Sequence, residues 1–501
     1  MFAAGHDVVL LLPLIMPGVL SRMARFRRRT MAETRVRRAR RLRAVRLAVM
    51  AVTILAVPHL CVAQDGRTDD PQKPPAKGQT SGASGTTSVA SPTPVSTTGV
   101  TPAAGTTAPP VAATTTPITG LFKEPELLTS GINYALKKFD SDDQRNKSGF
   151  YLELSNMITG SGWISAGPGY RRWVMNDKAF YDASAAVSWH LYTMAQTRFE
   201  APDLGKHHVQ IGVQAMYQDQ TQVNFFGVGP DSPDLKTQYR LKSTDTVGYA
   251  SIQPWTYWTL SGEAGYLFNP KVSSPTGTFK PDVPTTQDTF PDVPGVSTLV
   301  DQPNYVHAAA AFTGDTRDYR GHPTRGGMYR LSVDSYRDQD TGLFTFRQFQ
   351  AEALQLVRVT DPNWLLAFHG WLVTSDVNFD HQVPFYFLPS LGGATSLRSF
   401  QNYRFHDLNA LMVNAESRWA IYRHVDLAAF VDAGNVAPTV GTLNIDHTSV
   451  GAGLRFHAEH TNFARLDIAH GSEGWQVWFR TGDFFRLARL TRRVADIPFV
   501  P

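Results

Sequence analysis

From Phe150 onward, apolar and polar residues alternate along the chain with a period of two. In one such segment Leu427 and Val431 fall on one face of an extended strand, whereas Asp426 and Asp432 fall on the other. A barrel whose outer face meets lipid and whose inner face meets water requires this alternation. Every strand must also be paired, because lipid offers no hydrogen bonds to an open edge. The pattern therefore predicts an all-β fold, a transmembrane antiparallel β-barrel.

Fifteen segments of this kind lie between residues 150 and 485. Bacterial barrels of this type have an even number of strands. We therefore expect sixteen strands, one of them missed or wrongly divided before residue 205. The segments begin near Phe150, Trp163, Phe180, His207, Gln238, Trp258, Tyr305, Met328, Phe344, Trp364, Leu408, Val425, Ser449, Phe463 and Trp475.

The composition agrees with a barrel and argues against a bundle of membrane-spanning helices. Charged residues make up only 18% of the chain and aromatic residues 11%, while hydrophobic residues make up 42%. The mean hydropathy is −0.23. Several helical spans of about 20 apolar residues would make that value positive.

The net charge of +5 comes from one arginine-rich stretch, Arg22–Arg46, and the rest of the chain is mildly acidic. The basic pI of about 9.1 therefore does not indicate binding to nucleic acid, and we expect none. The single cysteine, Cys61, excludes a disulfide within the chain and a cysteine-based metal site.

Residues 1–63 have the organisation of a secretory signal. The arginine-rich stretch leads into the apolar run Leu47–Val57, and small residues precede a cleavage position after Ala63. The run is too short for a membrane anchor, which is the competing interpretation. Translation starting at Met23 or Met31 would account for the unusual segment before the arginines.

The rest of the chain divides into four further parts. Residues 64–120 are rich in Pro, Thr, Ser and Ala, which predicts a disordered linker that acts as a tether or binds a partner or the cell wall. Residues 121–149 contain one helical pattern, Glu126–Phe139, either a pre-barrel segment or a plug for the lumen. The barrel follows at 150–485, and a basic tail follows at 486–501.

Four stretches together resemble the bacterial surface-antigen barrel family, part of the superfamily of outer-membrane assembly barrels and two-partner-secretion translocators. They are GGATSLRSF from Gly392 to Phe400, DTRDYRGHPTRGG from Asp315 to Gly327, FVDAGNV from Phe430 to Val436, and FFGVGPDS from Phe225 to Ser232. The positions that match the family motifs are Gly392, Gly393, Phe400, Asp315, Arg317, Pro323, Gly326 and Gly434.

The resemblance implies a barrel of sixteen strands whose sixth extracellular loop folds into the lumen. It also implies that the loop arginine, Arg398 here, meets acidic residues on the inner wall, Glu416 and Asp432. Both acids lie on the polar phase of their strands, so the residue pattern agrees. An arginine can bind a carboxylate with two hydrogen bonds, which would clamp the loop in place. The alternative is an ordinary solvated loop arginine.

Three features depart from the family pattern. Ser399 stands where the family has glycine after the arginine, which predicts an altered approach of the backbone there. The mostly low-complexity segment between residues 64 and 148 accommodates none of the periplasmic transport-associated modules that most members carry. The tail Arg486–Pro501 continues beyond Phe485, the aromatic residue expected to end the last strand.

Motifs for catalysis and metal binding are not found in the sequence. It contains neither Gly-x-Ser-x-Gly nor His-Glu-x-x-His. His207 and His208 are adjacent and would point to opposite faces of a strand, whereas His381, His406 and His424 are expected to be scattered loop histidines. We therefore expect no catalytic, cofactor-binding or metal-binding residues.

The sequence thus predicts a monomeric barrel in the outer membrane of a Gram-negative-type bacterium, in contact with outer-membrane lipids. The expected function is insertion of an unfolded protein or lipid client into that membrane, or its translocation across it. The missing modules favour the alternatives, a passive or gated pore or a structural surface protein.

Overall fold

The computed structural model describes residues 120–138, 148–156, 164–205, 208–277, 282–296, 302–319, 322–359, 363–458 and 462–481. The predicted signal segment, the linker up to residue 119 and the basic tail lie outside these residues. Within the described part of the chain, none of the helices has the length and apolar character needed to cross a membrane.

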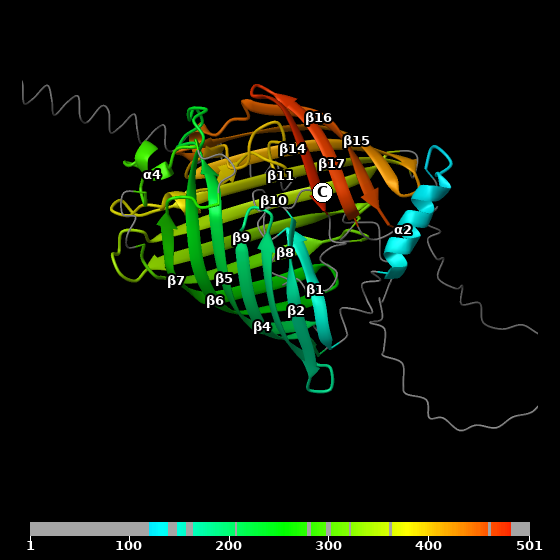
Figure 1. Ribbon diagram of the computed structural model, residues 1–501, viewed down its shortest axis with the longest axis horizontal. Coiled ribbons are helices and arrows are strands. Elements are labelled where there is room, and N and C mark those ends of the chain that lie inside the picture. The colour runs from blue at the N-terminus through cyan, green and yellow to red at the C-terminus, as the bar shows by residue number, and fades with distance from the viewer. Residues whose placement is uncertain are drawn as a thin grey trace, which may run out of the picture. The chain divides into compact units, whose positions relative to one another are not determined.

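Sixteen strands form one antiparallel sheet in which each strand pairs with the next along the chain (Figure 1). A separate sheet of two short strands, β12 (Ser390–Leu391) and β13 (Phe405–His406), interrupts the series. The strands of the large sheet are β1 (Gly149–Asn156), β2 (Ile164–Val174), β3 (Ala179–Ser188), β4 (Thr193–Leu204), β5 (Val209–Phe225), β6 (Thr237–Trp255), β7 (Trp258–Ser273), β8 (Tyr305–Asp315), β9 (Gly326–Asp338), β10 (Phe346–Arg358), β11 (Trp364–Asp376), β14 (Asn409–Tyr422), β15 (Val425–Ala437), β16 (His447–His457), β17 (Asn462–Gly471) and β18 (Gly474–Thr481).

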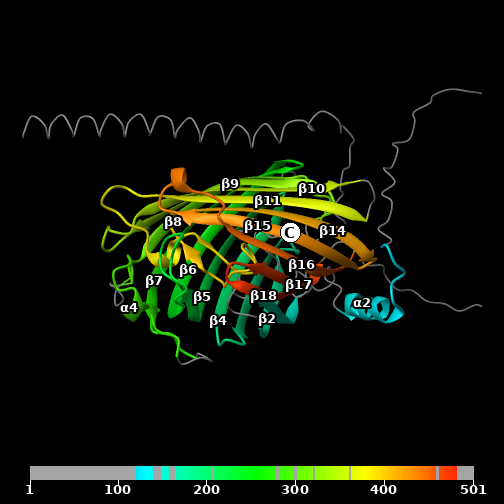
Figure 2. The ribbon, with the colours of Figure 1, turned by 90° about the horizontal axis from the view of Figure 1, so that it is seen from above.

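The large sheet curls round so that its first and last strands come near each other in both views (Figures 1 and 2). The predicted sixteen-stranded barrel is therefore confirmed. The strand missing from the sequence count is β4, which lies before residue 205 as expected. Its outward positions include Ala195 and Thr197, so its lipid-facing side gives a weak apolar signal.

The two faces of the strands have the predicted characters. On β15 the outward side chains of Leu427 and Val431 are 41% and 48% exposed, whereas the inward Asp432 is fully buried. On β18, Trp475 and Phe479 face outward in the same way. On these strands the outward side chains are thus apolar, as lipid requires, and the charged Asp432 is enclosed on the inner side.

The lengths of the connections give the orientation of the barrel. Short turns join strands at one end, as at residues 256–257 and 423–424, while the long connections 274–304 and 377–408 lie at the other end. Short turns face the periplasm and long loops face outward in such barrels. The first residue of β1 and the last residue of β18 therefore lie at the periplasmic end.

Further elements of the described chain lie outside the large sheet. The connection 377–408, which we call the lumen loop, contains η1 (Phe385–Phe387) and the β12–β13 hairpin, and the 274–304 connection contains α4 (Thr286–Thr289). Helix α2 (Glu126–Lys138) forms where the sequence predicted a helix over Glu126–Phe139, of which Phe139 lies outside the described residues. The segment before it is attached to the periplasmic end of β14, since the Leu121 and Phe122 amides donate to carbonyl oxygens of that strand.

Candidate functional site

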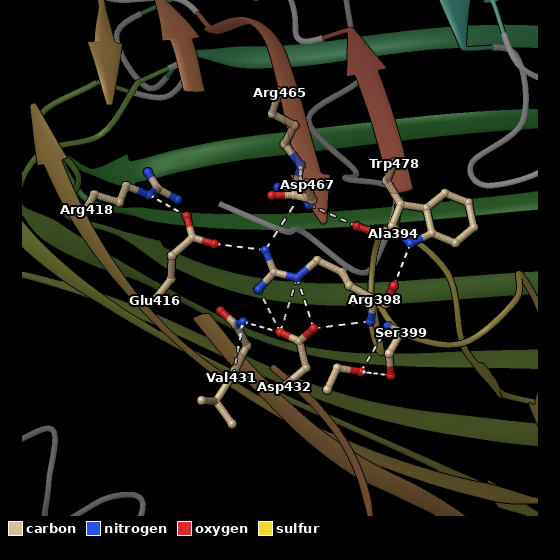
Figure 3. Close-up of polar contacts among 12 residues, drawn as sticks. Ala394, Arg398, Ser399, Glu416, Arg418, Val431, Asp432, Arg465, Asp467 and Trp478 are labelled. Atoms are coloured by element: carbon tan, nitrogen blue, oxygen red, sulfur yellow. Dashed lines mark hydrogen bonds and ion pairs between the residues drawn. The ribbon is translucent and has the colours of Figure 1, made fainter. Parts of the chain in front are cut away.

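Arg398 at the tip of the lumen loop binds Asp432 on the inner wall (Figure 3). Its Nε donates to Asp432 Oδ2 at 2.9 Å, and its Nη2 donates to Oδ1 at 2.7 Å. The backbone N–H of Arg398 donates to the same carboxylate at 3.1 Å. This bidentate contact constrains the orientation of the Arg398 side chain and pairs its charge with Asp432.

The guanidinium of Arg398 also contacts Glu416 on β14. Nη1 donates to Glu416 Oε2 at 2.9 Å and lies 3.8 Å from Asp467 Oδ2 on β17. Arg398, Glu416 and Asp432 thus meet as the resemblance implied, and the alternative of a solvated arginine is wrong for this structure.

Two further arginines complete the cluster on the wall. Arg418 Nε donates to Glu416 Oε1 at 2.7 Å. Arg455 on β16 bridges the two acids, donating to Glu416 Oε2 at 2.9 Å and to Asp467 Oδ1 at 2.6 Å. We call Arg398, Glu416, Arg418, Asp432, Arg455 and Asp467 the clamp cluster. It connects β14, β15, β16 and β17 to one loop.

Arg398 remains charged although it is buried. Burial alone would lower its pKa, but Asp432 and Glu416 raise the pKa of the guanidinium above its usual value. The face of the Phe430 ring lies 3.2 Å from Arg398 Cζ and adds a cation–π contact. A buried charge needs such partners, since a stranded one costs several kcal/mol.

The backbone of the lumen loop is attached to the last two strands. Trp478 Nε1 on β18 donates to the carbonyl oxygen of Arg398 at 2.6 Å. The Ala394 carbonyl oxygen accepts hydrogen bonds from Arg465 on β17 at 2.9 Å and from Arg480 on β18 at 3.5 Å. The loop therefore braces the terminal strands of the sheet as well as β14 and β15.

Two glycines in the loop motif allow the tip to turn tightly. Gly392 and Gly393 have φ values of +116° and +93°, which residues with a Cβ rarely adopt. A Cβ on Gly393 would overlap the Asn402 side chain. Phe400, two residues beyond Arg398, is fully buried in a loop core with Leu397 and Phe405.

Gly434 on β15 leaves space for the lumen loop to pack against the inner wall. A Cβ there would lie 3.3 Å from Leu391 Cδ1 of the β12–β13 hairpin and would overlap the carbonyl oxygen of Leu411. The missing side chain lets the hairpin pack directly against the strand. This explains why the FVDAGNV stretch carries a glycine two residues after the clamp acid Asp432.

Ser399, the departure from the family pattern, packs between Ser449 on β16 and Gly471 on β17. Its N–H donates to Ser449 Oγ at 3.0 Å, and the two hydroxyls lie 2.6 Å apart. A Cβ on Gly471 would overlap Ser399 Oγ. The room for the serine side chain is thus provided by a glycine on β17.

The remaining motif residues lie at the periplasmic turn between β8 and β9. Arg317 binds Asp315 with two hydrogen bonds of 2.8 Å. Gly326 has φ +89°, and a Cβ there would overlap the Thr316 carbonyl. Pro323 is buried within the turn.

The histidines singled out in the sequence occupy different sites. His406 lies in β13, where burial lowers its pKa to about 3. His424, in the β14–β15 turn, lies 2.8 Å through Nδ1 from Glu124 Oε2 of the pre-barrel segment. His381 contacts Asp380 at 3.8 Å, His208 pairs with Asp203 at 3.0 Å, and His207 lies outside the described residues.

Sequence reasoning missed Asp467, Arg455 and Arg418 of the clamp cluster, as well as Trp478. Each lies on the polar phase of its strand, which was the available signal. Many inward positions of a barrel are charged, however, so the pattern alone does not show which of them meet. The register between strands is needed for that.

Comparisons with known proteins agree with this geometry. The model of the Omp85 superfamily domain matches residues 180–471, more than half of the chain. No curated protein sequence matches the chain. Among solved structures, the crystal structure of BamA from Haemophilus ducreyi lacking POTRA domains 1-3 is similar, with a TM-score of 0.50 and 13% identity, over 71% of this chain and 77% of that chain. At this identity the likeness concerns the fold. The chain is an outer-membrane β-barrel of a Gram-negative-type bacterium and belongs to the Omp85 superfamily.

Proposed function

We propose that this barrel inserts protein clients into the outer membrane, or translocates them across it, through a seam between β1 and β18. The observation that carries the proposal is the attachment of the lumen loop to the strands that end at this seam. The Arg398 carbonyl is bound by β18, while the Arg398 side chain is bound by β14 and β15. Movement of the loop would therefore move one side of the seam.

The described sheet has its two unpaired edges at the seam. Within the described residues, the ladder of paired strands begins at β1 and ends at β18, and no register joins these two strands. The described parts of β1 and β18 contain 8 residues each, whereas β5, β6 and β7 contain 16 to 19. Unpaired strand edges are templates for pairing with another chain. An extended client segment could add to either edge by this mode.

The strand next to β1 also supports opening at this position. β2 contains Pro168, which lacks an N–H, between Gly167 and Gly169. The register of β2 with β3 skips Gly167 and Pro168. The β1–β2 hairpin is therefore joined to the wall by fewer hydrogen bonds than an uninterrupted pair of strands would have.

The clamp cluster would hold the other side of the seam. Its acids and arginines join four strands, β14 to β17, to the lumen loop, and Trp478 joins β18 to the same loop. This part of the wall would move as one unit while the β1–β2 hairpin separates from it. The proposal involves no enzymatic step.

Site-specific photo-cross-linking in cells tests this proposal. A photoreactive amino acid replaces Leu152 on β1 or Val477 on β18, both of which are outward-facing and exposed. We expect adducts with newly exported proteins at both positions. Leu331 on β9 is also outward-facing and exposed, so it provides the matched control and is expected to yield no client adducts.

Two results would contradict the proposal. Equal labelling at Leu331 and at the seam positions would show contact with neighbouring membrane proteins in general. A folded barrel that gives no protein adducts at Leu152 or Val477 would favour the alternative, a pore, and single-channel conductance would then measure that activity.

A further inference from the structure

A second cluster of buried polar residues lies at the periplasmic ends of β15 and β16, outside the clamp cluster. It consists of His322 from the β8–β9 turn, Asp426 from β15 and His457 from β16. The ligand atoms of these three residues all lie within 4.8 Å of one another, and all three residues are buried. The proposed function uses none of them.

The hydrogen bonds of the two rings fix their tautomers. His322 Nδ1 lies 3.1 Å from Asn462 Oδ1, and His457 Nδ1 lies 3.1 Å from the Ala458 carbonyl oxygen. Both oxygens can only accept, so both Nδ1 atoms carry a proton. A neutral imidazole then presents an unprotonated Nε2 with a free lone pair. This arrangement is the outer shell that metal-binding histidines usually have.

Both Nε2 atoms face the same carboxylate. His457 Nε2 lies 3.1 Å from Asp426 Oδ1, and His322 Nε2 lies 3.9 Å from Asp426 Oδ2. The two unprotonated Nε2 atoms and the Asp426 carboxylate can only accept hydrogen bonds. Without a positive charge between them, three buried acceptors would therefore face one another. One added proton on His457 Nε2 would satisfy its contact with Asp426 Oδ1 but would leave His322 Nε2 3.9 Å from Oδ2, too far for a hydrogen bond. Two added protons or one cation would serve both rings.

The stacking of the rings argues against two extra protons. The His322 and His457 rings are nearly parallel, at an interplanar angle of 10° with centroids 3.7 Å apart. Two imidazolium ions in face-to-face contact would repel each other strongly when desolvated.

We propose that His322, Asp426 and His457 bind one divalent transition-metal ion, with Zn²⁺ as the expected occupant. Two imidazole nitrogens and one carboxylate oxygen form a common ligand set for Zn²⁺, with a fourth position left for water. Bonds of about 2.0–2.2 Å require the rings to tilt out of their stack so that both lone pairs point at one ion. The Arg418 guanidinium acts electrostatically on His322 and Asp426, and its own pairing with Glu416 at 2.7 Å offsets part of that charge.

The ion would cross-link separate parts of the chain at the periplasmic end of the barrel. His322 belongs to the DTRDYRGHPTRGG stretch, which joins β8 to β9, whereas its two partners lie on β15 and β16. One ion would therefore tie a turn to strands that are several positions away in the sheet. This role does not depend on the proposed handling of clients.

Metal titration of the folded barrel tests the proposal. The purified full chain in detergent is stripped with a chelator and titrated with Zn²⁺ or Co²⁺ alone. We expect one ion per barrel, and a loss of affinity of roughly 100-fold or more in His322→Asn and His457→Asn. His208→Asn, which changes an exposed histidine of another periplasmic turn, is the matched control and is expected to bind like the wild type.

A second measurement applies even when a variant does not fold. Co²⁺ bound to the wild-type barrel is expected to show visible absorption typical of nitrogen and oxygen ligands in a four-coordinate site. Zn²⁺ is also expected to raise the temperature at which the wild-type barrel unfolds on semi-native gels. Wild-type barrel that gives no such absorption, or that binds Zn²⁺ no more tightly than His457→Asn, would overturn the proposal.

Discussion

The substitution Arg398→Ala tests the clamp cluster most sharply, because the structure shows which charges it strands. It removes the two-pronged contact with Asp432 and the contact with Glu416. Asp432 keeps the amide of Asn414 and the backbone N–H of residue 398, and Glu416 keeps Arg418 and Arg455.

Because these donors remain, we expect Arg398→Ala to lower the free energy of unfolding by roughly 3 kcal/mol, the lower end of the range for broken buried ion pairs. That corresponds to about two orders of magnitude in the unfolding equilibrium constant. Urea unfolding of the barrel in detergent, followed by mobility on semi-native gels, measures the change. The exposed Arg347 on β10 provides the control, and Arg347→Ala is expected to leave the unfolding midpoint unchanged.

A double variant separates loss of charge pairing from loss of packing. Arg398→Ala combined with Asp432→Asn removes the stranded charge, so it is expected to be more stable than Arg398→Ala alone. The reasoning would be refuted if Arg398→Ala unfolded with the same free energy as the wild type. It would also be refuted if the losses of unfolding free energy in Arg398→Ala and Asp432→Asn simply added in the double variant.

Three further predictions concern other contacts of the loop and of the pre-barrel segment. Gly393→Ala is expected to expose the lumen loop to added protease while the strands stay protected, because φ is +93° and a Cβ would overlap a neighbouring side chain. Gly471→Ala is expected to lower the unfolding midpoint in urea, and adding Ser399→Gly should restore part of the loss because the overlap with the hydroxyl disappears. The pKa of Glu124 is lowered from 4.5: burial opposes this, but hydrogen bonds from His424 and Thr129 outweigh it. Because the pKa of Glu124 is lowered in the folded state, its charge stabilises docking of the pre-barrel segment above pH 4.5, and this contribution is lost as the pH falls below that value. Hydrogen exchange of residues 120–132 should become faster at low pH in the wild type and not in Glu124→Gln.

The strands could be predicted from the sequence because lipid imposes one apolar face on every strand. Leu427 and Val431 follow this rule, and β15 is found where the pattern places it. The pattern failed at β4, where small outward residues such as Ala195 reduce the contrast between the faces. Lipid-facing positions require apolar character rather than size, so a strand of this kind leaves little trace in the sequence.

The sites could be predicted only in part. Arg398 and its two acids followed from a motif and from the phase of two strands. Asp467 lies on β17, and its meeting with Arg398 depends on the register of β16 and β17. The cluster of His322 and His457 combines a turn with a distant strand, and no local spacing marks it. Such contacts arise from closure of the barrel, which sequence separation does not reveal.

The most direct test of the central claim compares outer-membrane and surface proteins in cells with and without this gene. If the barrel inserts or translocates clients, a small set of proteins should be selectively lost from the membrane or surface, and the wild-type chain should restore them. An outer membrane unchanged except for the absence of the barrel itself would contradict the claim.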